Sequence, residues 1–341
     1  MQSNLETSKY REPWLDAVRS FACLCVILIH APIPNGQDGQ YVIAITNYFG
    51  TGGASMLFFM ISGALIFNRQ QPTIPFIKKR LKRIVFPLTF WTLAFLTIKL
   101  LSGEIGSKEY LISIVSIPIA PQEGTFWFLY VIIGIYLLTP IISTWLNHSS
   151  KTDVEIFLGL WSLTLLFPII RQFIPIIDET INFNHGWLYY YFGFIGNCVL
   201  GLYLRRYCNL DIKSWKQRLF ILTTLLLPLI LYGIKVIDHE NIQTRMAFNE
   251  VMLSICYFLI IKKIDYSKKA SAVLENISKH TFGIYLVHIL VMRHFLWPLL
   301  QDYNIHYALQ IPLIVIVTFS LSYLIVHLIS KLPFSKYIVG I

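Results

Sequence analysis

Apolar stretches long enough to span a membrane recur along the chain, from residue 14 to residue 330. A helix needs roughly 20 predominantly apolar residues to cross the hydrocarbon core of a bilayer. The pattern therefore predicts an all-α, polytopic membrane protein. We expect about ten spanning helices, at residues 14–33, 41–67, 84–101, 126–146, 154–176, 187–204, 219–237, 247–261, 281–300 and 308–330. The apolar segment 111–120 is too short to cross and is interpreted as interfacial or re-entrant.

The placement of Lys and Arg residues predicts how these helices are oriented. With the N-terminus in the cytoplasm, the inner connections hold 21 of the 28 basic residues, and the outer connections hold only Lys108, Arg171 and Arg245. This distribution follows the positive-inside rule, so both termini are predicted to be cytoplasmic. The net charge of +10 then reflects topology and not nucleic-acid binding, because no basic stretch is interleaved with stacking aromatics on a soluble domain.

The composition agrees with a single membrane domain. Hydrophobic residues make up 55% of the chain and charged residues 13%, and the mean hydropathy is +0.61. We expect one domain over 1–341, with a short cytoplasmic segment 1–13 and no soluble extracytoplasmic domain. A cleaved signal peptide is not expected, because Asp16 and Arg19 interrupt the first apolar stretch. The five cysteines lack paired ligand spacing, so neither a disulfide framework nor a metal site is expected.

Two residues that are costly to place in hydrocarbon, Arg19 and His30, lie in the first predicted helix. Eleven residues at about 100° each make almost three turns, so both side chains share one helix face, roughly 16 Å apart along the axis. Ionisable residues in a spanning helix normally face the bundle interior and mark a pathway or a reacting group. We therefore expect the functional site to lie along this helix.

A basic cluster, 78–83, lies just before the third predicted helix. Within it, Arg80 and Arg83 are three residues apart and share a helix face. Their planar guanidinium groups suit a clamp on phosphate oxygens, because they can bind these oxygens bidentately. An inner connection also gathers Lys and Arg for topology alone, so the cluster by itself fits either a ligand site or topology.

Two further positions have an ordinary and a functional interpretation. Ser62 follows Gly52 and Gly53 in a segment whose small residues favour close helix packing, and its hydroxyl either lines a polar cavity or bonds back to its own helix. Trp127 begins the fourth predicted helix on the outer side. It is either an interfacial anchor, as Trp commonly is, or a wall of an acceptor site.

The ninth predicted helix carries Tyr285 and His288 one turn apart, with Arg293 and His294 further along it. A lone His in a helix is more often a hydrogen-bonding residue than a catalyst. We therefore expect His288 to support the site and not to perform the chemistry.

Together these elements resemble the acyltransferase-3 family of integral membrane O-acyltransferases. The resemblance extends over nearly the whole chain and rests on Trp14-Leu15-Asp16-Ala17-Val18-Arg19 leading to His30, Phe58-Phe59-x-x-Ser62-Gly63, Arg80-x-x-Arg83-Ile84 with Pro87, Trp127-Phe128-Leu129 and Tyr285-x-x-His288. It implies ten spanning helices, an acyl-CoA donor on the cytoplasmic side and acyl transfer to a sugar hydroxyl. It also implies that Arg19 and His30 are essential.

The chain departs from the family pattern in two ways. Ser20 stands where many members have Gly after the Arg, which affects helix packing more than chemistry. The extracytoplasmic domain of some relatives is also missing, so the chain resembles the stand-alone acetylases of surface polysaccharides. That resemblance implies a bacterial cytoplasmic membrane as its location, with acetyl-CoA as donor and an exported or lipid-linked glycan as acceptor.

These implications assign expected roles to the candidate residues. Arg80, Arg83 and Arg19 would hold the phosphate end of acyl-CoA, and the thioester would lie near His30. A neutral imidazole suits proton removal from the acceptor hydroxyl, so His30 is the expected general base, although a covalent acyl-His intermediate would use the same residue. Supporting or acceptor-site roles are expected for Asp16, Ser62, Trp127, Tyr285 and His288.

Two other classes of function would also use a polar site in the membrane. A transporter or flippase for a polysaccharide unit needs intramembrane Arg and His residues along its passage, but the internal repeats expected of one are not found. A non-catalytic scaffold leaves the cost of burying Arg19 and His30 unexplained. The acyl group is expected to be acetyl, with succinyl as the alternative.

Overall fold

The computed structural model describes residues 11–32, 37–68, 71–167, 170, 191, 193–211, 213–233, 248–303 and 305–341. Over these residues the chain forms helices and no strand, which confirms the all-α prediction. Six helical stretches in the described part are long and apolar enough to cross a membrane, namely Pro13–His30, Ile45–Ile66, Thr73–Leu101, Gly124–His148, Lys268–Leu300 and Tyr307–Ser330. The protein is therefore a polytopic membrane protein.

The first apolar stretch forms α1 (Pro13–His30), as predicted. The second predicted span, 41–67, corresponds to the spanning stretch Ile45–Ile66. This stretch is not one unbroken helix, because the chain forms α2 (Gln37–Gly53) and α3 (Ser55–Ile66) with a break at Ala54. At Gly53 the chain passes so close to α1 that a Cβ atom would lie 2.3 Å from the sulfur of Cys25. The break accompanies this close approach.

The third predicted helix begins earlier than expected. In the structure α4 (Thr73–Leu101) runs through the basic cluster 78–83 and through Pro87, so the cluster is helical and not part of a loop. Lys and Arg are good helix formers, and a hydropathy pattern detects only the apolar part of such a helix. Next along the chain are α5 (Ser107–Ser116), which is short as predicted and buries none of its residues, and α6 (Trp127–His148).

The middle of the chain contains four described helices, α7 (Lys151–Thr164), α10 (Ile195–Tyr207), α11 (Trp215–Gly233) and α13 (Phe248–Lys263). The spans predicted in this region lie partly outside the described residues, namely 154–176, 187–204, 219–237 and 247–261. The total of ten spanning helices therefore stays a prediction.

The last part of the chain begins with α14 (Lys268–Ile289), which starts well before the predicted residue 281. Ser267 caps this start, because its hydroxyl accepts a hydrogen bond from the backbone N–H of Ala270. The elements that follow are a π-helical segment (Leu290–Leu296), α15 (Trp297–Leu300), α16 (Tyr307–Ser330) and α17 (Ser335–Ile338). The sequence analysis did not predict α17, because four residues carry no periodic signal.

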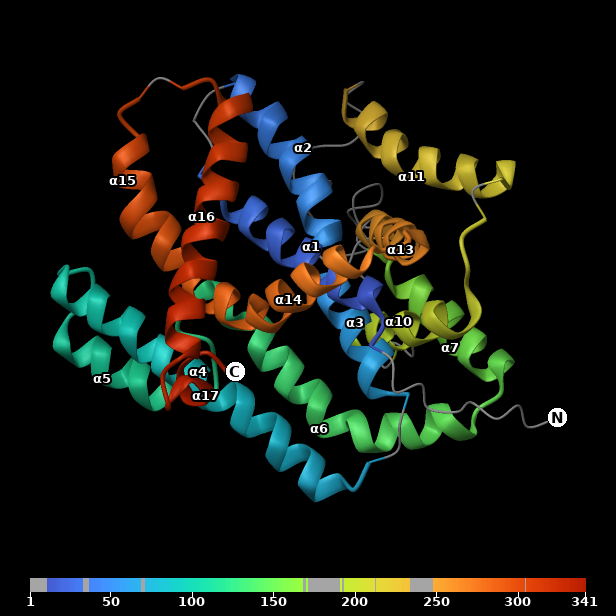
Figure 1. Cartoon of the computed structure of the whole chain (residues 1–341), viewed down its shortest axis with the longest axis horizontal. Helices are drawn as coiled ribbons and strands as arrows, with labels where there is room; N and C mark the ends of the chain where they lie inside the picture. Colours follow the sequence, from blue (N-terminus) through green and yellow to red (C-terminus); the bar gives the residue numbers. More distant parts are fainter. Residues whose placement is uncertain are drawn as a thin grey trace.

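Helix α1 lies in the middle of the arrangement, in contact with α2, α3, α13, α14 and α16 (Figure 1). Beside it, α3 and α10 pack backbone against backbone. A Cβ atom at Gly63 would lie 1.8 Å from the carbonyl oxygen of Cys198, and one at Gly201 would lie 2.0 Å from that of Met60. Small residues allow this close packing, so the glycine-containing segment after Phe59 has a structural use.

Candidate functional site

Two neighbouring cavities lie beside α1, and we name them by their ionisable residues. The arginine cavity has a volume of about 170 Å³ and is lined from α1, α3, α4, α6 and α14. Its polar lining residues are Arg19, Ser62, Arg80, Arg83, Tyr136, Ser278, Lys279, Thr281 and Tyr285. The structure thus brings together all three arginines that the sequence analysis assigned to one ligand, although they come from two different helices.

Each of the three guanidinium groups is held in a different way. Arg19 donates a hydrogen bond of 3.1 Å from Nη1 to the hydroxyl of Ser278 on α14. The guanidinium of Arg80 lies over the ring of Phe76 on its own helix and over the ring of Tyr136, at 5.6 Å from each ring centroid. Aromatic ring faces attract a cation. Arg83 donates from Nε to the carbonyl oxygen of Gly340 at 2.7 Å.

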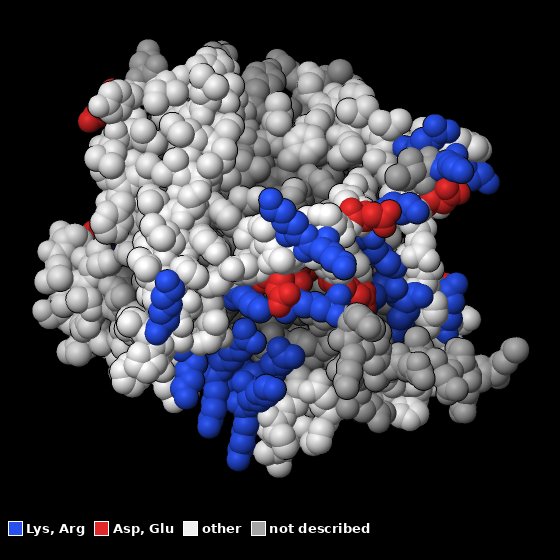
Figure 2. All heavy atoms as spheres, viewed as in Figure 1, with Lys and Arg blue, Asp and Glu red and all other residues white. Residues whose placement is uncertain are grey.

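The arginine cavity lies on the basic side of the molecule. Figure 2 shows Lys and Arg side chains gathered over α14 and over the first half of α4, with a further group at the upper right near α11, whereas the upper left of the same face carries almost none. A cavity lined by three arginines and surrounded by further cations attracts anions, because their potentials add.

The histidine cavity is smaller, about 60 Å³, and is lined by His30 at the other end of α1. Its other polar and aromatic lining residues are Thr51, Ser55, Phe58, Thr125, Trp127, Phe128, Glu250 and Tyr285. Trp127 thus lines the same cavity as His30, and its role as a wall of an acceptor site stays a prediction.

His288 lies directly behind this cavity. Its ring centroid is 5.5 Å from that of His30, and its side chain is fully buried. Its Nδ1 lies 2.6 Å from the carbonyl oxygen of Tyr285, so Nδ1 carries the proton and donates it. Its Nε2 is then the acceptor nitrogen, and within the described part of the chain it has no hydrogen-bond partner.

An aromatic wall separates the two cavities. We give this name to Phe58, Phe128 and Tyr285, the three residues that line both. The ring of Phe128 lies 5.8 Å from each of the other two rings, between centroids. Tyr285 is fixed further by its hydroxyl, which donates a hydrogen bond to the carbonyl oxygen of Thr125. The wall is thus a packed set of rings from α3, α6 and α14.

The match to a known protein family covers this whole site. Residues 12–327 match a family described as an acyltransferase domain. The chain belongs to the acyltransferase-3 family. Every residue that lines the two cavities of this acyltransferase lies within the match, whereas α17 and the residues after it lie beyond it. No curated protein and no solved structure matches the chain.

Two predicted site residues of this acyltransferase line neither cavity, namely His288, described above, and Asp16. The carboxylate of Asp16 is buried and accepts two hydrogen bonds from Arg11, at 2.6 Å and 2.8 Å. These bonds raise the pKa of Arg11 above its usual range. Arg11 also reaches Glu275 on α14 at 3.2 Å, so Asp16 and its partner join the start of α1 to α14.

The sequence analysis missed Glu250, a lining residue of the histidine cavity. Its side chain on α13 is 1% exposed, so a carboxylate is buried in the same cavity as His30. The signal was available, because Glu250 is the only charged residue in the predicted span 247–261. An ionisable residue inside a span is a candidate functional residue by the same reasoning that singled out His30.

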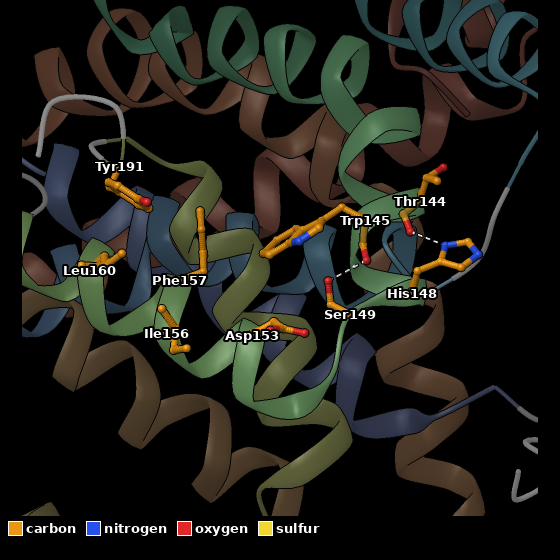
Figure 3. Close-up of a pocket in the computed structure, with 9 residues that line it drawn as sticks. All are labelled: Thr144, Trp145, His148, Ser149, Asp153, Ile156, Phe157, Leu160 and Tyr191. Carbon is orange, nitrogen blue, oxygen red and sulfur yellow. Dashed lines mark hydrogen bonds between the residues drawn. The ribbon is translucent and has the colours of Figure 1, made fainter. Parts of the chain in front are cut away.

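A third hollow has a different character. It measures about 610 Å³, lies between α6 and α7, and its polar side chains are bonded locally (Figure 3). His148 Nδ1 lies 2.8 Å from the carbonyl oxygen of Thr144. The hydroxyl of Ser149 donates a hydrogen bond of 2.8 Å to the carbonyl oxygen of Trp145. Its described lining contains no Lys or Arg, so it offers nothing to hold a phosphate.

Proposed function

We propose that the protein transfers an acyl group from acyl-CoA to a hydroxyl of an exported or lipid-linked glycan, with acetyl as the acyl group and His30 as the general base. One observation carries the proposal, namely that an arginine-lined cavity and a histidine-lined cavity share a single wall. Acyl-CoA has phosphates at one end and a thioester at the other. The arginine cavity suits the phosphate end, and the histidine cavity suits the thioester end.

The arginine cavity supports a phosphate-bearing donor. Guanidinium groups bind phosphate oxygens bidentately and keep their charge at all working pH values. Arg19, Arg80 and Arg83 come from two helices and line one cavity, which topology alone does not require. Arg19 also lies on the same helix as His30, so the phosphates and the reacting end would be placed by one rigid element.

The reaction follows from a base beside the thioester. The acceptor oxygen attacks the thioester carbonyl carbon while the imidazole of His30 takes the hydroxyl proton. The carbon–sulfur bond then breaks, and the CoA thiolate leaves with the proton that the imidazolium returns. The alternative role of the same residue is nucleophilic, in which the imidazole nitrogen takes the acyl group from the thioester, the CoA thiolate leaves, and the hydroxyl then takes the acyl group from the imidazole.

The size and lining of the histidine cavity favour a short, uncharged acyl group. Its volume of about 60 Å³ is less than half of the 170 Å³ of the arginine cavity, so it accommodates a short acyl group more readily than a long one. A succinyl group ends in a carboxylate, and the described lining of this cavity contains Glu250 but no Lys or Arg. An unpaired buried charge is costly, so acetyl fits better than succinyl.

The proposal is tested with the purified protein in liposomes, labelled acetyl-CoA and surface glycan from the host as acceptor. We expect label in the glycan, and mass spectrometry of the glycans from cells with and without the protein identifies the acyl group. His294→Ala is a matched control, because this exposed histidine lines neither cavity and its loss should leave the rate unchanged. Glycan export without any acylation would favour the transporter instead.

A further inference from the structure

The residues after α16 fold back against α4. We call residues 335–341 the strap, because they run along α4 and are fixed at several points. Trp91 on α4 donates from its indole nitrogen to the carbonyl oxygen of Ile338 at 2.8 Å. Val339 is completely buried, and its side chain lies against Gly283 of α14. The strap is therefore a packed part of the molecule, although it lies beyond the family match.

The strap is joined by a hydrogen bond to Arg83, a lining residue of the arginine cavity. Arg83 donates from Nε to the carbonyl oxygen of Gly340 at 2.7 Å. A guanidinium carries five N–H donors, and this bond uses only the one nearest the side-chain stem. The two terminal nitrogens, which form the fork that binds phosphate, have no hydrogen bond to any described protein atom. The bond thus orients the group and leaves its binding face available.

The backbone at Gly340 suits this task and tolerates no side chain. Its φ angle is +69°, in the left-handed region that favours glycine. A Cβ atom there would lie 2.7 Å from the ring of Phe282, which lines the arginine cavity, and 3.0 Å from the carbonyl oxygen of Arg83. A substitution at Gly340 would have to move the strap, the ring or α4.

We propose that Gly340 is a positioning residue for donor binding, and that the strap holds the guanidinium of Arg83 in the orientation that grips a phosphate of acyl-CoA. This inference rests on the proposed function, because it takes acyl-CoA as the ligand of the arginine cavity. The strap contributes no phosphate ligand of its own. It lowers the cost of ordering a long, partly exposed side chain at the moment of binding.

The test measures the dissociation constant of CoA for the purified, full-length protein. Arg83→Gln should weaken binding roughly tenfold or more, because a charge-assisted pair is lost. Gly340→Ala should weaken it about threefold to tenfold. In the Arg83→Gln background the same Gly340→Ala change should add less than about twofold, because its effect passes through Arg83. In an Arg80→Gln background it should keep its full effect.

Two further variants distinguish positioning from general damage. Gly103→Ala is a matched control, because Gly103 also has a positive φ, +77°, but has nothing within 4 Å of its Cβ position. It should leave CoA binding unchanged. Trp91→Phe removes the hydrogen bond to Ile338 together with part of a buried ring, and loosens the strap without changing Arg83. It should weaken CoA binding in the same direction as Gly340→Ala, and it serves if that variant does not fold.

The outcomes separate the inference from the function on which it rests. Wild-type protein that binds no CoA would overturn the proposed donor and the role of the strap with it. Wild-type binding that is weakened by Arg83→Gln but not by Gly340→Ala or Trp91→Phe would overturn the role of the strap alone. Equal effects of Gly340→Ala in the Arg83→Gln and Arg80→Gln backgrounds would do the same, because they would show a general loss of stability.

Discussion

Arg19 and His30 lie on one helix yet line different cavities. Their separation of eleven residues, about 16 Å along the axis, spans the aromatic wall between the two cavities. A single rigid helix can therefore hold the two ends of an extended donor at a fixed distance. The consequence at the scale of residues is that substitutions at the two positions should fail in different ways.

His30→Ala should abolish acylation and leave CoA binding intact. Loss of general-base catalysis costs about 100-fold to 10,000-fold in rate, whereas the arginine cavity would be unchanged. The wild-type rate should fall at low pH, since a protonated imidazole cannot accept a proton, and the residual rate of the variant should lack this decrease. Steady-state acetyl transfer and CoA binding, each followed against pH, check both expectations. Near wild-type acylation by a folded variant would contradict the mechanism.

Tyr285→Phe and His288→Ala should reduce acylation by less than His30→Ala does. Tyr285 fixes the aromatic wall through its bond to Thr125, and His288 lies behind His30. A buried hydrogen-bonding group left unsatisfied costs about 1–3 kcal/mol, less than the loss of a general base. The acylation rates of the three variants, compared at equal amounts of folded protein, test this order. A larger loss in the His288 variant would place the base on α14.

Individual residues differed in how far the sequence could predict them. Arg19 and His30 were predictable because a charge or a base in a long apolar stretch needs a reason. Asp16 was assigned a supporting role through the family resemblance, but its charge is already matched by Arg11, only five residues away. That pairing depends on how the chain enters α1, which the hydrophobic pattern does not describe.

Helix packing determines where the cavities lie. The backbones of α3 and α10 touch at Gly63 and Gly201, so the side chains of α3 on either side of this contact are fixed relative to the bundle. One of them is Phe58 of the aromatic wall and another is Ser62 of the arginine cavity. Any separation of α3 from α10 should therefore disturb the wall.

Gly63→Ala should destabilise the protein by about 3 kcal/mol or more, because its Cβ would overlap the carbonyl oxygen of Cys198 and push backbone from backbone. Gly134→Ala is the matched control. This glycine lies inside α6 with nothing within 4 Å of its Cβ position, so alanine should raise stability by about 0.5–1 kcal/mol. Thermal unfolding in detergent measures both changes. Equal unfolding midpoints for the two variants would contradict the packing argument.

The elements themselves were predictable where they are apolar and not where they are charged or short. Hydropathy located α1, α6 and α16 to within a few residues. Hydropathy placed the starts of α4 and α14 too late, because the N-terminal part of each helix carries Lys or Arg and precedes the apolar run. No property of the sequence alone revealed that the residues after α16 return to α4.

In the molecule as a whole, the aromatic wall is the only partition between the arginine cavity and the histidine cavity among the described residues. An acyl-CoA bound across both would have to pass its arm between these rings. The wall should therefore limit which acyl groups reach His30. Neither cavity was predictable as a volume from the sequence, because each is made by side chains from three or more helices.

Phe128→Ala should widen the range of accepted donors. Removing the ring that contacts both other members of the wall opens space beside the histidine cavity. The ratio of kcat/KM for butanoyl-CoA to that for acetyl-CoA should rise about tenfold, since one or two methylenes in a pocket are worth about 1–3 kcal/mol. Competition between the two labelled donors measures this ratio directly. An unchanged ratio in an active variant would show that the wall does not gauge acyl length.

The same wall also bears on the membrane potential. A protein with polar cavities in the hydrocarbon region risks becoming an ion-conducting path if those cavities join into one column of water. Three packed rings keep the two cavities apart, so the proposed donor and acceptor could meet without a continuous aqueous route. Proteoliposomes carrying the Phe58→Ala, Phe128→Ala double variant should lose an imposed potassium diffusion potential faster than wild-type proteoliposomes. The rings would then act as electrical insulation for the cell as well as a boundary within the enzyme.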